Sequence, residues 1–129
     1  MSKIKYELPM FSSNLVSEPN ITIKNMDVEI VVEGYDDEDI FRRICIKFSS
    51  VLGIKQTSAR FTPNLYDAYD KIVQIKGSEW LKEMQELNND DYSYWKPNHY
   101  AMYLDGMGLY QFIAKSVEVI EHVWFGNIE

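Results

Sequence analysis

The sequence predicts an α+β domain: an antiparallel sheet built from hairpins, with one main amphipathic helix (about residues 78–88) packed on one face. Two segments that alternate apolar and polar residues on either side of an acidic turn indicate the first hairpin. An Asp-Gly turn between two aromatic segments indicates the second. The chain has 129 residues and no linker, repeat or low-complexity tract, so we expect a single domain over residues 1–129.

The first twenty residues are the least patterned part of the chain. Pro9 and Pro19 mark connections rather than regular elements. We therefore expect residues 1–20 to form a loosely ordered N-terminal arm.

The first hairpin is predicted from alternating side chains. In residues 27–33, valine and isoleucine alternate with mostly acidic residues, and residues 40–48 place isoleucine and phenylalanine on one side. Such alternation is typical of a strand with one buried face. With the turn in the middle of the acidic stretch, Ile30 is expected to face Ile44. Arg42 departs from the pattern, because it falls on the apolar face close to the turn.

A strand and the main helix are expected between the two hairpins. Residues 71–75 are short and β-branched, which favours a strand, although a helical interpretation of residues 65–73 competes with it. Ser78 is a suitable N-cap for the helix, because its hydroxyl can accept a hydrogen bond from a free backbone N–H. Apolar residues then recur on one helical face until the polar run at residues 88–91 ends the helix.

The second hairpin follows in the C-terminal third. Residues 99–104 and 109–114 flank an Asp105-Gly106 turn, and a second glycine close by supplies the positive φ angles that tight hairpins need. The second strand is expected to continue over residues 116–120 after a bulge.

Charge and composition exclude several function classes. Thirteen Lys and Arg against twenty Asp and Glu give a formal charge of −7, which is unsuited to binding nucleic acid or an anionic membrane surface. The single cysteine, Cys45, cannot form an internal disulfide. No signal peptide is visible, and charges interrupt every apolar run well before the ~18 residues of a membrane span. We expect a cytoplasmic protein without a nucleic-acid or membrane partner.

No pattern in the sequence indicates catalysis, a metal or a cofactor. His99 and His122 are far apart and have no nearby cysteine or histidine at the spacing of a zinc site. Cys45 lies in the middle of a predicted strand, without a neighbour that would activate its thiol. We therefore expect no catalytic residue, no metal ligand and no cofactor.

Two acidic stretches are candidate partner-binding sites. One is the turn of the first hairpin, and the other mixes acids with aromatic rings after the main helix. Like charges held close together create a field that a basic partner can sense. A solvated turn in the first case, and core packing of the rings in the second, are the competing structural interpretations. The candidate residues are Asp36, Asp37, Glu38, Asp39, Asp90, Asp91, Tyr92 and Tyr94.

Two further stretches carry a family resemblance. They are Ser78-Glu79-Trp80-Leu81 and the segment from His99 to Asp105, which continues through Gly108, Tyr110, Phe112 and Glu118. Together they resemble small single-domain bacterial proteins found as immunity proteins beside polymorphic toxins. The resemblance covers about residues 71–120 and implies a fold and a protein-binding role. It assigns no catalytic residue.

These observations lead to one principal hypothesis and two alternatives. We expect a non-enzymatic protein-binding domain, an immunity-type inhibitor that neutralises a cognate toxin by masking its surface, and a negative chain would be steered onto a basic toxin domain. One alternative is a small enzyme or ligand-binding domain with a pocket near Trp80, His99 and Asp105. The other is a structural homo-oligomer that uses an exposed edge strand. The sequence leaves the oligomeric state open.

Overall fold

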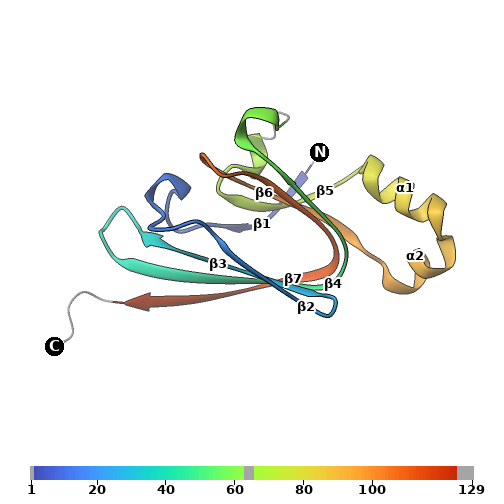
Figure 1. Cartoon of the computed structure of the whole chain (residues 1–129), viewed down its shortest axis with the longest axis horizontal. Coiled ribbons are helices and arrows are strands. Elements are labelled where there is room, and N and C mark those ends of the chain that lie inside the picture. The colour runs from blue at the N-terminus through green and yellow to red at the C-terminus, as the bar shows by residue number, and fades with distance from the viewer. Residues whose placement is uncertain (1, 63–65, 125–129) are drawn as a thin grey trace.

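Seven antiparallel strands dominate the computed structural model, which describes residues 2–62 and 66–124 (Figure 1). The strands are β1 (Ser2–Glu7), β2 (Asn20–Lys24), β3 (Asp27–Tyr35), β4 (Phe41–Thr57), β5 (Lys71–Ile75), β6 (Asn98–Leu104) and β7 (Gly108–Trp124). They form one sheet in the order β1-β5-β6-β7-β4-β3-β2, so β1 and β2 are its two edges.

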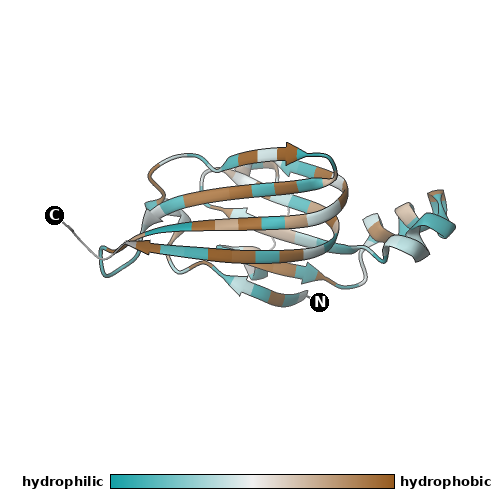
Figure 2. Cartoon of the chain, turned by 90° about the horizontal axis from the view of Figure 1, so that it is seen from below, coloured by the Kyte–Doolittle hydropathy of each residue, from teal (hydrophilic) through white to brown (hydrophobic). Residues whose placement is uncertain are grey.

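The helices are few and short, and they correct the predicted fold class. They are α1 (Glu79–Leu87), α2 (Asn89–Trp95) and the 3-10 turns η1 (Ser12–Asn14), η2 (Ala59–Phe61) and η3 (Tyr66–Ala68). With 57% strand and 20% helix, the domain is sheet-dominated, not a balanced α+β fold with one main helix. Neither α1 nor α2 has a buried residue, and both project beyond one end of the sheet (Figure 2).

The sheet covers its own apolar face because its two longest strands bend. β4 and β7 are 17 residues each and curve sharply along their length (Figure 1). The bend coincides with a positive φ of 53° at Ser50 and with a bulge between Val51 and Gly53. A bulge inserts one unpaired residue and bends the strand that carries it. The two halves of the sheet therefore face each other, and no helix is needed to close the core.

The core lies between these two halves. Phe48 of β4 stacks on Phe112 of β7, with ring centroids 4.2 Å apart, and Tyr100 of β6 lies 5.7 Å from Phe48. Apolar and polar residues alternate along the strands (Figure 2), so one face of each strand enters this core. The buried residues of this cluster are Leu8, Met10, Val28, Ile30, Val32, Ile44, Ile46, Phe48, Ile72, Tyr100, Met102, Leu104, Tyr110, Phe112 and Ala114.

The first hairpin forms as predicted but in a register shifted by two residues. Ile30 pairs with Ile46 rather than with Ile44, which instead faces Val32. A shift of two leaves every side chain on its predicted face, because side chains alternate with a period of two. The turn is centred one residue later than expected, and Asp36 determines its position, as described below.

The first twenty residues correct the prediction of a loose arm. Residues 2–7 form edge strand β1, which pairs with β5. The backbone N–H of Leu8 then donates to the carbonyl of Asp70 at 2.9 Å, and Leu8 and Met10 are both buried in the core. The pairing could not be seen in the sequence, because β1 faces solvent on most of its length and shows no clear alternation.

The segment between the hairpins was predicted in part. Residues 71–75 form β5. Within the described residues 66–73, the competing helix is reduced to the 3-10 turn η3, and residue 65 lies outside the described residues. Ser78 caps α1, and its hydroxyl accepts from the N–H of Leu81 at 3.1 Å. Asn88 ends α1 and also caps α2, a second helix that differs from the predicted end of helical structure at residues 88–91.

The second hairpin was predicted correctly up to the bulge. Gly106 and Gly108 both adopt positive φ in its turn. β7 runs without interruption to Trp124, and the extra residue lies in its partner β4 instead.

Candidate functional site

The turn between β3 and β4 carries four carboxylates. One of them has a structural role, and the other three are exposed. Asp36 is buried: its Oδ1 accepts from the backbone N–H groups of Glu38 and Ile40, both at 2.9 Å. Its Oδ2 accepts from Arg42 Nε at 2.7 Å. Arg42 holds the pKa of Asp36 below its usual value, and the bonds from the backbone add to this effect. Asp36 therefore holds the turn in place and, unlike the other three predicted acids of the turn, is not exposed.

The same contact explains why an arginine lies on the apolar face. Arg42 also reaches Glu121 of β7, with Nη1 3.5 Å from Oε1. Glu121 in turn accepts a hydrogen bond from the Tyr6 hydroxyl of β1. Burial raises the pKa of Tyr6, and the bond to Glu121 raises it further. This chain of contacts joins edge strand β1 to the β3–β4 turn across the open end of the folded sheet.

Three carboxylates of the turn remain exposed. They are Asp37, Glu38 and Asp39, which we call the acidic turn. The Asp36 bonds and a positive φ of 65° at Asp39 fix its backbone. The three charges therefore occupy a defined position rather than a flexible loop.

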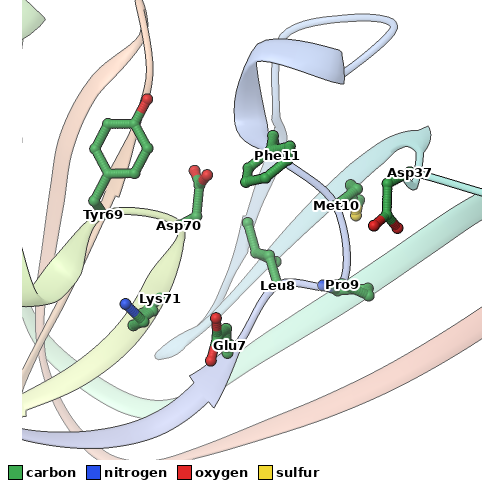
Figure 3. Close-up of a pocket in the computed structure, with 9 residues that line it drawn as sticks. All are labelled: Glu7, Leu8, Pro9, Met10, Phe11, Asp37, Tyr69, Asp70 and Lys71. Carbon is green, nitrogen blue, oxygen red and sulfur yellow. The ribbon is translucent and has the colours of Figure 1, made fainter.

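A cleft of about 330 Å³ lies beside the acidic turn (Figure 3). It forms where the segment after β1 passes between the β3–β4 turn and the start of β5. We call it the acidic cleft, because three of its side chains are carboxylates and one is a lysine. Its lining residues are Glu7, Leu8, Pro9, Met10, Phe11, Asp37, Tyr69, Asp70 and Lys71.

Asp70 is the unusual residue of this cleft. It is only 8% exposed, and its Oδ1 is buried without a hydrogen-bond partner among the described residues. Its backbone is held on both sides, since its N–H donates to Tyr103 and its carbonyl accepts from Leu8, both at 2.9 Å. Buried polar atoms are normally paired, because an unpaired one costs roughly 1–3 kcal/mol. In Figure 3 the Asp70 side chain extends into the space between Tyr69 and Phe11.

Two partly exposed rings flank Asp70. Phe11 is 61% exposed and Tyr69 is 41% exposed. Tyr69 is supported from behind by Tyr103, with ring centroids 5.5 Å apart. Burial raises the pKa of Tyr69, and the carboxylates of Asp105 and Asp70 raise it further. A carboxylate beside partly exposed aromatic rings is suited to bind an organic cation.

The second predicted patch lies at the opposite end of the molecule. Asp90 and Asp91 are in the first turn of α2, where Asn88 bonds both the N–H and the carboxylate of Asp91. Tyr92 is partly buried, and Tyr94 is 75% exposed. The β3–β4 turn lies at the left of Figure 1 and the two helices at the right, so the two patches do not form one surface.

The alternative pocket near Trp80, His99 and Asp105 is not assembled. His99 is buried at the start of β6, where Nδ1 lies 2.7 Å from Ser78 Oγ and Nε2 lies 2.8 Å from Gln111 Oε1. The Trp80 ring meets the imidazole edge-on at 5.3 Å. Asp105 follows the far end of β6, six residues away, which corresponds to about 20 Å along an extended strand.

Within residues 2–62 and 66–124, no group of three or more His, Cys, Asp or Glu side chains could hold a metal ion. Burial raises the pKa of Cys45, and the charge of Glu29 adds to that effect, so the thiol is poorly activated.

No helix in the described part of the chain is long and apolar enough to cross a membrane. Comparison of the chain with known protein families, curated proteins and solved structures found no match in any of the three.

The acidic cleft could not be predicted from the sequence. Glu7, Tyr69 and Asp70 lie far apart from Asp37 in the chain and meet only because the sheet folds over. An Asp before a β-branched strand is a common turn signal, and nothing in the sequence indicates that its side chain is buried.

Proposed function

We propose that this chain is a non-enzymatic protein-binding domain of the immunity type, which neutralises a cognate toxin by masking its surface. The observation that carries the proposal is the position of the acidic turn beside the acidic cleft. Asp37 belongs to both, so exposed charge and a recess adjoin each other on one end of the molecule. A surface of this kind suits a basic partner, because complementary charge steers association.

The surroundings of His99 and Cys45 support a binding role over a catalytic one. Both ring nitrogens of His99 are engaged by neighbouring side chains, and the surroundings of Cys45 disfavour the thiolate. Catalytic groups need an accessible reacting atom. The acidic cleft, in contrast, offers carboxylates and rings, which recognise a partner without reacting with it.

Affinity capture from the native cells tests the proposal. The tagged wild-type chain is compared at moderate salt with an acidic-turn variant carrying Asp37→Asn, Glu38→Gln and Asp39→Asn. Asn tolerates the left-handed backbone of Asp39, so the fold should be retained. We expect the wild type to retain one stoichiometric basic protein and the acidic-turn variant to lose it.

A charge-matched control separates a local effect from a loss of net charge. The far-end variant carries Glu86→Gln, Asp90→Asn and Asp91→Asn. It also removes three negative charges, but these charges lie on the two helices instead of in the acidic turn. It should retain the partner. Equal loss from both variants would contradict a role for the acidic turn, and capture of no protein would contradict the proposed function.

The open edge of β2 favours a second candidate function, a structural homo-oligomer. All five residues of β2 are exposed, and Ile23 is 63% exposed beside the unpaired side of the strand. An unpaired edge can add a strand from another chain. Light scattering during size-exclusion chromatography tests this: a monomer at micromolar concentration would contradict it, and a defined dimer would support it.

A further inference from the structure

The charge of the acidic cleft is not balanced within the cleft. Lys71 lies opposite Glu7 in the pairing of β1 with β5, so these two residues face each other across strands. Asp37 and Asp70 have no cation among the lining residues that stands opposite them in this way. The cleft therefore retains negative charge that an external cation can meet.

The burial of Asp70 also points to a ligand, independently of the net charge of the cleft. Asp70 is more than nine-tenths buried, it lines the cleft, and its Oδ1 has no hydrogen-bond partner in the described ranges. The backbone on either side holds it in this position. An unsatisfied buried acceptor at the wall of an acidic recess is the arrangement expected where a ligand donates the missing hydrogen bond.

The size and the lining residues of the cleft indicate which kind of cation it can bind. The described carboxylates are not grouped closely enough to hold a metal ion. A space of about 330 Å³ is also much larger than a single ammonium group needs. The partly exposed rings of Phe11 and Tyr69 stand on either side of Asp70, and a planar guanidinium stacks on such rings while donating several hydrogen bonds in one plane.

We infer that the acidic cleft receives the guanidinium of one arginine side chain of a protein partner. The inference rests on the proposed protein-binding function and names the anchor of that contact. Asp70 accepts from the guanidinium in the cleft, the rings of Tyr69 and Phe11 lie beside it, and Asp37 lies at the junction with the acidic turn. The acidic turn steers the partner, and the cleft holds it.

A short capped peptide, acetyl-Gly-Arg-Gly-amide, tests the inference directly. Its binding to the full chain is followed by NMR titration of the backbone amides. We expect shifts at residues 7–11 and 69–71. The same peptide with citrulline, which keeps the shape and lacks the charge, should bind at least about 10-fold more weakly. Equal binding of citrulline or of a lysine peptide would overturn the assignment, and so would free arginine that binds more tightly than the capped peptide.

Asp70→Asn is the decisive variant, because asparagine also tolerates the φ of 57° at this position. It should weaken arginine-peptide binding at least about 10-fold. Asp90→Asn is the matched control, since it makes the same change of charge in helix α2, at the other end of the molecule and outside the cleft. Phe11→Ala removes an exposed ring and should weaken binding several-fold even if Asp70→Asn fails to fold. Unchanged binding in the Phe11 and Asp70 variants would overturn the inference.

Measurements with a captured partner separate this inference from the proposed function. Loss of partner binding in the acidic-turn variant, with full binding in Asp70→Asn, would contradict the arginine anchor and leave the protein-binding function intact. Peptide binding at the cleft without capture of any protein would support guanidinium recognition and contradict the proposed function.

Discussion

The indole ring of Trp80 lies directly over Gly53, where an added Cβ would stand 2.8 Å from the Cζ2 atom of the ring. The same ring contacts His99 at its edge, and the ammonium of Lys55 lies 4.3 Å from its centroid. Trp80 therefore attaches the otherwise exposed helix α1 to the outside of the sheet. The missing side chain at Gly53, next to the bulge of β4, makes room for it.

Gly53→Ala should destabilise the domain by about 1–3 kcal/mol, because the ring must shift to admit the new methyl group. Chemical denaturation measures the change. In a Trp80→Ala background the same substitution should cost much less, since no ring remains to be displaced. An equal cost in both backgrounds would show that Gly53 is needed for its backbone rather than for Trp80.

The two glycines of the β6–β7 turn should respond very differently to alanine. A Cβ at Gly108 would lie 2.1 Å from the carbonyl oxygen of Thr57, whereas nothing lies within 4 Å of a Cβ at Gly106. Gly108→Ala should cost more than about 3 kcal/mol or prevent folding. Gly106→Ala should cost about 1–2 kcal/mol, from its left-handed backbone alone. Thermal denaturation compares them, and similar costs would contradict the close contact with Thr57.

Asp36→Asn should lower the stability of the domain at neutral pH, because the turn loses its charged contact with Arg42. The pKa of Asp36 in the folded chain lies below its ordinary value of 3.8. The stabilisation that the ionised Asp36 carboxylate gives to the fold is therefore fully present above that value. It is lost as the pH falls through the lowered pKa. The stability difference between wild type and variant should shrink in acid. Asp37→Asn, one residue away and exposed, should leave stability unchanged at pH 7.

His99 should make the stability depend on pH between 7 and 5.5. Burial holds its pKa below the ordinary value of 6.5, and the nearby charge of Lys55 contributes. Below pH 6.5, His99 therefore binds a proton in the unfolded chain but stays neutral in the folded chain. The free energy of unfolding then falls as the pH drops, by at most about 1.4 kcal/mol per pH unit. His99→Gln should remove this slope. Identical slopes in wild type and His99→Gln would exclude His99 as the cause.

Local patterns were sufficient to predict the two hairpins and the start of α1. The alternation in residues 27–33, the Asp105-Gly106 turn and the Ser78 cap each express a preference within a few residues. The sequence did not reveal how the sheet closes. β4 extends to Thr57 through a bulge, and a bulge has no reliable sequence signal. A helix was therefore expected to cover the core that the bent sheet covers itself.

Only the exposed acids of the candidate site could be predicted from the sequence, because their charge alone indicates that they face solvent. Asp37, Glu38 and Asp39 are exposed as expected, because three adjacent acids in a turn have few other environments. Asp36 could not be distinguished from them, since its burial depends on Arg42 and on backbone N–H groups of a turn whose register was unknown. Asp70 joins them in space through the pairing of β1 with β5, a contact between distant parts of the chain.

The dissociation constant of a captured partner, measured for the two charge-matched variants, tests the central claim most directly. Wild type, acidic-turn variant and far-end variant are titrated at low and at moderate salt. We predict that the acidic-turn variant binds at least about 10-fold more weakly at low salt and loses much of the salt dependence, while the far-end variant changes by less than about 2-fold. Equal weakening by both variants, or a stronger effect at the helices, would contradict binding through the acidic turn and its cleft.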